Sequence, residues 1–198
     1  MLNLFSNKHI YMKQIIFLLC VAFSSTVSQA QTKISDVTLP DSYTAGTDKL
    51  VLNGGGTREK YWMDMYVGAL YLTAKSKDAS AVISANTSMC IRMCIVSSLI
   101  TSSRMQEAVK EGFEKSTGGQ QDSYKDKIAQ FQKAFSEEIK KGDVFDIVYT
   151  AEIISIYKNN VLKSTIPGLD FKKAVFGIWL GAEPADGDLK EGMLGEAD

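Results

Sequence analysis

Three consecutive glycines lead directly into an arginine in the stretch Asn53-Gly54-Gly55-Gly56-Thr57-Arg58. An arginine side chain can bind a carboxylate or another oxyanion through two parallel hydrogen bonds, and it stays charged. Most arginines in proteins are instead solvated at the surface. The residue pattern leaves these two interpretations of Arg58 about even, although the neighbouring glycines favour a buried guanidinium.

The glycines themselves do not form a phosphate-binding motif. The stretch lacks the Lys-Ser/Thr ending of a P-loop, and it does not lead from a strand into a helix as a dinucleotide fingerprint does. Glycines inside a strand more often mark a bulge or the close approach of another group. That group is either a ligand or a neighbouring helix, and the sequence does not decide between them.

Tyr66 is the second candidate for a binding residue, because it lies in the middle of an apolar strand-like segment. One interpretation is a core tyrosine whose hydroxyl has a single partner, and the other is a hydroxyl that donates to a ligand. If the turn after Arg58 lies at Glu59-Lys60, Arg58 and Tyr66 are out of register by more than about 10 Å. A bulge or a different turn would shorten that offset.

The N-terminal 30 residues have the layout of a secretory signal peptide. They carry Lys8 and Lys13 but no acidic residue, then an apolar run at 15–23, then Ser28-Gln29-Ala30. The run is shorter than the roughly 20 residues of a membrane-spanning helix, so an uncleaved anchor is the less favoured alternative. We therefore expect cleavage near Ala30, a periplasmic or secreted protein, and one domain at 31–198.

The composition of residues 31–198 excludes several functional classes. Without the two lysines of the signal, 20 basic and 23 acidic residues remain, and the net charge of −3 gives no reason to expect nucleic acid. The only histidine, His9, lies in the signal, which excludes Ser-His-Asp or Cys-His catalysis and histidine metal sites. We expect no metal or other cofactor, and the oligomeric state stays open.

Cys90 and Cys94 lie in the segment CIRMC, which we interpret as part of a strand. Four strand residues span roughly 13 Å, whereas a disulfide needs Cα atoms within about 7 Å. We therefore predict two small buried thiols on one strand face rather than a disulfide.

Apolar periodicity predicts an α+β chain. Alternation predicts strands at 50–58, 61–72, 88–98, 143–151, 153–158 and 161–166. Helical spacing predicts helices at 78–85, 101–115, 122–141 and 171–180, with a loop at 41–48. In the segment 61–72, Trp62, Tyr66, Leu70 and Leu72 share one face, while Met65 lies on the other. Short connections favour antiparallel pairing, so we expect a largely antiparallel sheet with helices on one face.

The segment LNGGGTREKYWMDMYVGALYL resembles the opening strand pair of the chalcone isomerase-like superfamily, especially its secreted bacterial members. GLDFKKAVFGIWLG, followed by Asp188-Leu189-Lys190 and Met193-Leu194-Gly195, resembles the C-terminal helix and tail of that family. The resemblance extends from about Val37 to Gly195. It implies an open-faced β-sandwich, in which a large antiparallel sheet carries a layer of helices and ligand binds in a cleft between them.

The same resemblance implies roles for particular residues. The cleft arginine of chalcone isomerases, which close a flavanone ring, falls on Arg58, and their threonine on the next strand falls on Tyr66. The plant fatty-acid-binding relatives hold a carboxylate with an arginine and a tyrosine. A tyrosine, a lysine and an asparagine of the plant enzymes fall on Arg104, Glu107 and Glu111, so their network for activating a phenol is missing here.

These observations favour a non-catalytic cell-envelope protein that binds a fatty acid or a similar apolar carboxylate. Arg58 would pair with the acid and Tyr66 would donate a hydrogen bond. Trp62, on the same strand face as Tyr66, would be a further ligand-binding residue, and Arg104 would add positive charge near the mouth of the cleft. The alternative is a structural or interaction protein, in which side chains such as Trp62 close the cleft. A chalcone isomerase-type lyase is the third hypothesis, since Tyr, Glu or Lys would have to supply the general acid or base.

Overall fold

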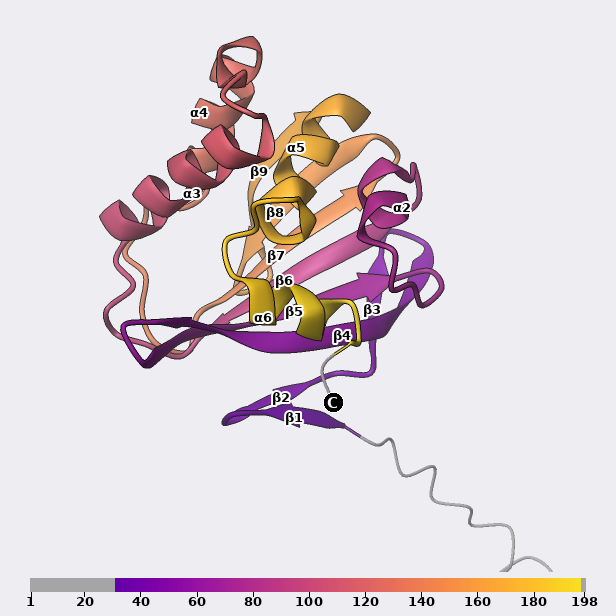
Figure 1. Ribbon diagram of the computed structural model, residues 1–198, viewed down its shortest axis with the longest axis vertical. Coiled ribbons are helices and arrows are strands. Elements are labelled where there is room, and N and C mark those ends of the chain that lie inside the picture. The colour runs from indigo at the N-terminus through magenta and orange to yellow at the C-terminus, as the bar shows by residue number, and fades with distance from the viewer. Residues whose placement is uncertain (1–30, 197–198) are drawn as a thin grey trace, which may run out of the picture. The chain divides into compact units, whose positions relative to one another are not determined.

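Seven antiparallel strands form one strongly curled sheet whose order follows the chain, as described for residues 31–196 in a computed structural model (Figure 1). The strands are β3 (Ser42–Ala45), β4 (Asp48–Lys60), β5 (Met63–Leu72), β6 (Met89–Ile95), β7 (Val144–Thr150), β8 (Ile153–Lys158) and β9 (Val161–Pro167). The signal peptide that the sequence predicts at 1–30 lies outside the described residues. The α+β class and the antiparallel sheet are confirmed.

Helices cover one face of this sheet (Figure 1). They are α2 (Ala79–Ser84), α3 (Ser102–Ser116), α4 (Lys125–Lys133) after the short 3-10 helix η1 (Gln121–Tyr124), α5 (Leu169–Leu180) and α6 (Gly187–Met193). The main core lies between sheet and helices, where Phe113, Phe145 and Phe176 are fully buried. No helix within residues 31–196 has the length and apolar character needed to cross a membrane.

A small hairpin covers part of the other sheet face. It consists of β1 (Thr32–Ile34) and β2 (Val37–Leu39), and Leu39 packs with Leu50 and Val67 in a second apolar cluster. As a result, β5 is buried on both faces from Met65 to its end, as its apolar sequence predicts. The prediction of a loop at 41–48 is wrong, because Ser42–Ala45 forms the edge strand β3 and pairs with β4.

The turn between β4 and β5 also differs from the prediction. It lies at Tyr61-Trp62, where both residues have left-handed φ angles of 55° and 60°, and not at Glu59-Lys60. Trp62 therefore belongs to the turn and does not share a strand face with Tyr66. The sequence did not predict this turn, because apolar alternation continues through it and it lacks the Asn and Gly residues that usually mark such loops.

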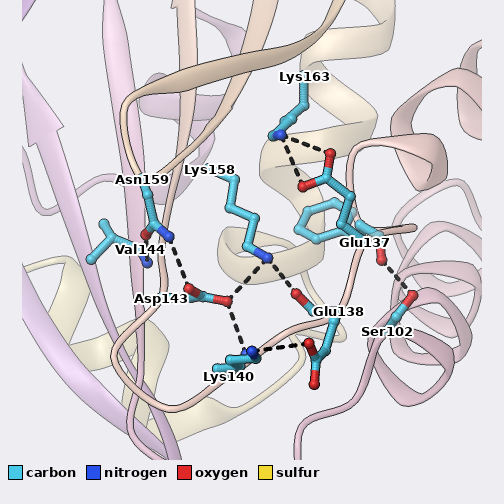
Figure 2. Close-up of polar contacts among 10 residues, drawn as sticks. Ser102, Glu137, Glu138, Lys140, Asp143, Val144, Lys158, Asn159 and Lys163 are labelled. Atoms are coloured by element: carbon cyan, nitrogen blue, oxygen red, sulfur yellow. Dashed lines mark hydrogen bonds and ion pairs between the residues drawn. The ribbon is translucent and has the colours of Figure 1, made fainter.

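The helix predicted at 122–141 ends earlier, at Lys133. Its apolar stripe is still buried through Phe135 and Ile139, but residues 134–143 follow a non-helical path. Figure 2 shows why this path is stable: Ser102 Oγ donates to the Phe135 carbonyl over 2.6 Å, and Lys158 Nζ donates to the Glu138 carbonyl. Side chains from other elements thus satisfy carbonyl groups that a longer helix would have paired internally.

Asp143 anchors the end of the same segment (Figure 2). Its carboxylate lies 3.1 Å from Lys158 Nζ and accepts hydrogen bonds from Asn159 Nδ2 and the Lys140 amide. Burial alone would raise the pKa of this carboxyl, but the three hydrogen bonds outweigh burial and lower the pKa below its ordinary value. The contacts join the loop after α4 to the end of β8 and the turn between β8 and β9.

Both cysteines lie on β6 as free thiols, on the sheet face opposite the helices. Cys90 is fully buried and Cys94 is half-buried. Burial raises the pKa of both thiols, so they are poor nucleophiles at neutral pH. As predicted, the two thiols share one face of a strand.

Candidate functional site

A cleft of about 440 Å³ opens between the β4–β5 hairpin and helix α3. The hairpin contributes Arg58, Lys60, Tyr61 and Met65, and the other wall comes from Leu99, Ile100 and one face of α3. Its apolar lining consists of Met65, Leu99, Ile100, Met105 and Ala108. The charged lining consists of Arg58, Lys60, Arg104, Glu107 and Glu111.

Arg58 faces this cleft because of the register between β4 and β5. It pairs directly with Tyr66 across the two strands, so both side chains project toward the helix layer. The offset of more than about 10 Å that a turn at Glu59-Lys60 implies is therefore wrong. The turn lies two residues later, and an irregularity between Arg58 and Glu59 absorbs the remaining mismatch.

That irregularity also changes the direction of Met65. The residue has no partner in the β4–β5 register, because Arg58 pairs with Tyr66 and Glu59 pairs with Asp64. Met65 is buried in the core on the helix side, the same side as Tyr66, and it lines the cleft. Simple alternation had assigned it to the opposite face from Tyr66.

The guanidinium of Arg58 is only partly satisfied. Its central carbon lies 5.7 Å from the centre of the Tyr66 ring, a distance at which a cation is attracted to the ring face. Within the part of the chain that the structure describes, its buried Nε has no hydrogen-bond partner. A buried donor without an acceptor costs about 1–3 kcal/mol, so an oxygen ligand that reached this atom would be bound favourably.

Tyr66 lies in the core beneath the cleft, which is one of the two interpretations that the sequence left open. Its side chain is only 3% exposed and does not line the cleft. The hydroxyl accepts a hydrogen bond of 2.9 Å from Trp179 Nε1 on α5, and burial raises the pKa of the phenol. The structure therefore supports the interpretation of Tyr66 as a core tyrosine that lies beneath Arg58.

The other two candidate residues are Arg104, which lines the cleft, and Trp62, which does not. Arg104, in the first turn of α3, is exposed and lines the cleft, and its Nη1 donates to the Leu99 carbonyl over 3.0 Å. Trp62 lies outside the lining and is 96% exposed, so it does not close the cleft. Its neighbour Tyr61 lines the mouth instead.

Sequence reasoning did not assign Lys60, Tyr61, Ile100 or Met105 to the site. One signal was available for α3: Arg104, Glu107, Ala108 and Glu111 follow the spacing of a single helix face. All four line the cleft. Three of them, Arg104, Glu107 and Glu111, are the positions where the plant enzymes have a tyrosine, a lysine and an asparagine according to the family resemblance.

The glycines of β4 allow close packing of other parts of the chain: Gly54 and Gly56 face helix α6, and Gly55 faces Ile34 and Leu39 of the β1–β2 hairpin. A Cβ atom on Gly54 would lie 2.2 Å from the Gly192 carbonyl oxygen of α6, and one on Gly192 would lie 2.6 Å from the Gly55 carbonyl oxygen. Asn53 stabilises the contact between β4 and α6, because its Nδ2 donates to the Met193 carbonyl over 2.8 Å. Helix α6 thus packs directly on the strand that carries Arg58.

Comparison with known proteins agrees with this architecture. The family model described as chalcone isomerase-like matches residues 31–195. The chain belongs to the chalcone isomerase-like family. A crystal structure of a fatty-acid binding protein from Arabidopsis thaliana matches with a TM-score of 0.64 and 19% sequence identity, over 80% of this chain and 92% of that chain. At that identity the likeness shows a shared fold, and no curated protein matches the sequence.

This member of the chalcone isomerase-like family therefore has a small cleft lined by both apolar and charged side chains, with one buried arginine nitrogen that has no partner among residues 31–196. The cleft also has two acidic residues, Glu107 and Glu111, on the wall that faces the hairpin. Such a lining can hold an anionic group near Arg58 and apolar groups against Met65 and Ile100.

Proposed function

We propose that this protein is a non-catalytic binding protein of the cell envelope, and that it holds a fatty acid or a similar apolar carboxylic acid in the cleft. The observation that carries the proposal is Arg58, which lines the cleft beside apolar side chains and whose buried Nε has no hydrogen-bond partner among residues 31–196. A carboxylate oxygen would satisfy that donor, and the rest of the guanidinium fork would strengthen the contact.

The dimensions and lining of the cleft suit an apolar acid. Its volume of about 440 Å³ is within the range of small-molecule sites, and such sites combine apolar walls with a few polar anchors. In our proposal Arg58 is the anchor, Arg104 adds positive charge at the mouth, and Met65 and Met105 contact the apolar tail. Tyr66 supports Arg58 from behind, and Trp62 makes no contact with the ligand.

The location in the cell envelope rests on the sequence of residues 1–30, which has the charge and apolar pattern of a secretory signal. A fatty-acid binding protein of known structure shares the fold, which makes an acid ligand a natural first choice for experiment.

The first test is native mass spectrometry of the purified protein, followed by solvent extraction of whatever co-purifies. An apolar acid at close to one per chain would support the proposal. A clean apo mass that stays unchanged after long-chain acids are added would contradict it, and would make an interaction protein the leading account. Turnover of a chalcone would contradict the non-catalytic assignment.

The second test assigns the anchor. Replacing Arg58 by Ala should weaken binding of the acid by roughly 1.5–3 kcal/mol, the usual value of a hydrogen bond to a charged group. The affinity for the methyl ester of the same acid should change little, because the ester lacks the charge. Lys49→Ala is a matched control, since Lys49 is an exposed basic residue on the same strand. An equal loss for acid and ester would remove Arg58 from the carboxylate site.

A further inference from the structure

The β4–β5 hairpin ends in a group of exposed apolar side chains that the proposed function does not use. Tyr61 is 72% exposed, Trp62 is 96% exposed and Met63 is 43% exposed. Leu99, from the loop before α3, is 38% exposed and lines the same cleft mouth as Tyr61. We call these four residues the aromatic tip. Within residues 31–196 they make up four of the seven large apolar side chains that are exposed.

The backbone of the tip does not favour these residues. Tyr61 and Trp62 both have φ near 60°, in a two-residue turn that favours Asn and Gly. The turn between β8 and β9 shows the usual solution, because Asn159 and Asn160 occupy the same left-handed region there. A bulky side chain pays a conformational cost in this region, of the order of 1 kcal/mol per residue. Neither turn chemistry nor burial explains a Tyr-Trp pair at this place.

The chemistry of the side chains indicates what they contact. Tryptophan and tyrosine combine an apolar ring with one polar atom, and they gather where a lipid bilayer meets water. Lys60 lies beside them with its ammonium 5.5 Å from the centre of the Tyr61 ring. A lysine there can bury its aliphatic stem while the charge stays at the level of the headgroups.

The position of the tip relates this surface to the cleft. Tyr61 and Leu99 belong both to the tip and to the cleft lining, so a surface that touches the tip also faces the cleft mouth. Glu59 and Asp64 flank the turn and offset the charges of Arg58 and Lys60. The tip therefore offers apolar contact without a strong net charge, which suits the interface of a neutral phospholipid bilayer better than an anionic surface.

We propose that the aromatic tip docks onto a phospholipid bilayer, with Trp62 inserted at the interface, and that the apolar acid passes between the bilayer and the cleft through the mouth beside Tyr61. The docking step stands on the tip itself, whereas the transfer of acid rests on the proposed function.

The two tryptophans make docking measurable by fluorescence. Trp62 is exposed and Trp179 is buried, so vesicles should change the emission of Trp62 alone. Adding phosphatidylcholine vesicles to the protein should shift the emission to shorter wavelength, and phosphatidylcholine with brominated acyl chains should quench it. Flotation with the same vesicles should show a weak dependence on salt. An unchanged spectrum and no flotation would overturn the proposal and leave a protein partner as the occupant of the tip.

Trp62→Asn is the decisive variant, because asparagine suits the turn and the variant should fold at least as stably as the parent. It should lower vesicle binding roughly tenfold, in keeping with the value of one large apolar side chain. Val161→Asn is the control, since Val161 is exposed on β9 away from the tip and its replacement should leave binding unchanged. Equal binding by Trp62→Asn and the parent would overturn the proposal, as would binding that needs anionic lipid and disappears in high salt.

A soluble acid separates this inference from the proposed function. Trp62→Asn should bind decanoic acid from aqueous solution as the parent does, but should take up acid from vesicles more slowly. If neither protein binds decanoic acid, the proposed function fails while flotation still decides docking. If both take up acid from vesicles at the same rate, the role of the tip in transfer is overturned.

Discussion

Arg58 and Tyr66 are direct partners across β4 and β5, and the Arg58 guanidinium carbon lies 5.7 Å from the centre of the Tyr66 ring. The Tyr66 hydroxyl in turn accepts a hydrogen bond from Trp179 on α5. The arginine at the cleft is therefore supported by a tyrosine ring that the helix layer holds in place. In this arrangement the ring of Tyr66 contacts the cleft arginine, and its hydroxyl forms a hydrogen bond within the core.

Tyr66→Phe should separate these two roles. The variant keeps the ring beneath Arg58 but leaves the buried Trp179 N–H without its acceptor, so the free energy of unfolding should fall by about 1–3 kcal/mol. The affinity for an apolar acid should stay close to that of the parent. Urea denaturation and calorimetric titration measure the two quantities. A large loss of affinity at unchanged stability would show that the hydroxyl contacts the ligand.

Glu107→Gln and Glu111→Gln should each strengthen acid binding. Both side chains line the cleft, where their negative charges repel a bound carboxylate. The gain should be about 0.2–1 kcal/mol for such solvent-exposed charges, and it should shrink in high salt. Glu114→Gln is the control, because it removes the same charge from an exposed position on α3 that does not line the cleft. The hypothesis of a carboxylate ligand would lose support if all three variants bound equally well.

Gly54→Ala should destabilise the protein by disturbing α6. The added Cβ would lie 2.2 Å from the Gly192 carbonyl oxygen, and backbone atoms cannot move aside cheaply. Overpacking of this kind typically costs 1–3 kcal/mol. Gly187→Ala, in α6 itself, is the matched control, since no atom lies within 4 Å of its added Cβ. Thermal or urea denaturation would compare them, and equal stability of the two variants would mean that α6 does not pack on β4 as described.

Because of Lys172, the free energy of unfolding should vary with pH in the alkaline range. The side chain is fully buried on α5, where its ammonium donates to the carbonyls of Val82, Ile83 and Ala85 at the end of α2. Burial, and then the charge of Lys173, lower its pKa from 10.5 to about 8. Between these two values the unfolded chain binds more protons than the folded protein, so this residue should make stability rise with pH across that window.

Lys172→Met provides the comparison. The stability of the parent relative to the variant should grow between about pH 8 and pH 10.5, by at most about 3 kcal/mol. Below pH 8 the difference should be constant, because Lys172 is then protonated in both states. Urea denaturation across this range measures the difference at each pH. A difference that is flat from pH 7 to pH 11 would show that the folded-state pKa is not lowered.

Much of the fold follows from local sequence. The alternation in 153–158, the Asn159-Asn160 turn and the helix that ends at Leu180 all correspond to elements of the structure, because each depends on short-range periodicity and turn chemistry. The two cysteines were predicted correctly for the same reason, since strand geometry alone keeps them apart. The family was also recognisable from its first strand pair and its last helix.

Other features depended on contacts between distant segments. The glycines indicated a close approach, but only the packing of α6 identified a helix more than 130 residues away as the approaching group. The path of residues 134–143 depends on Lys158 and Ser102, which no local pattern connects to it.

The candidate site shows the same division. The sequence by itself determined only the candidates, which came from the glycines beside Arg58, the apolar strand around Tyr66 and the family resemblance: Arg58, Tyr66, Trp62 and Arg104. The tertiary structure decided which of them share the cleft, because one turn position and one bulge set the β4–β5 register. A shift of a single residue turns every side chain of a strand to the opposite face, and local periodicity cannot detect it.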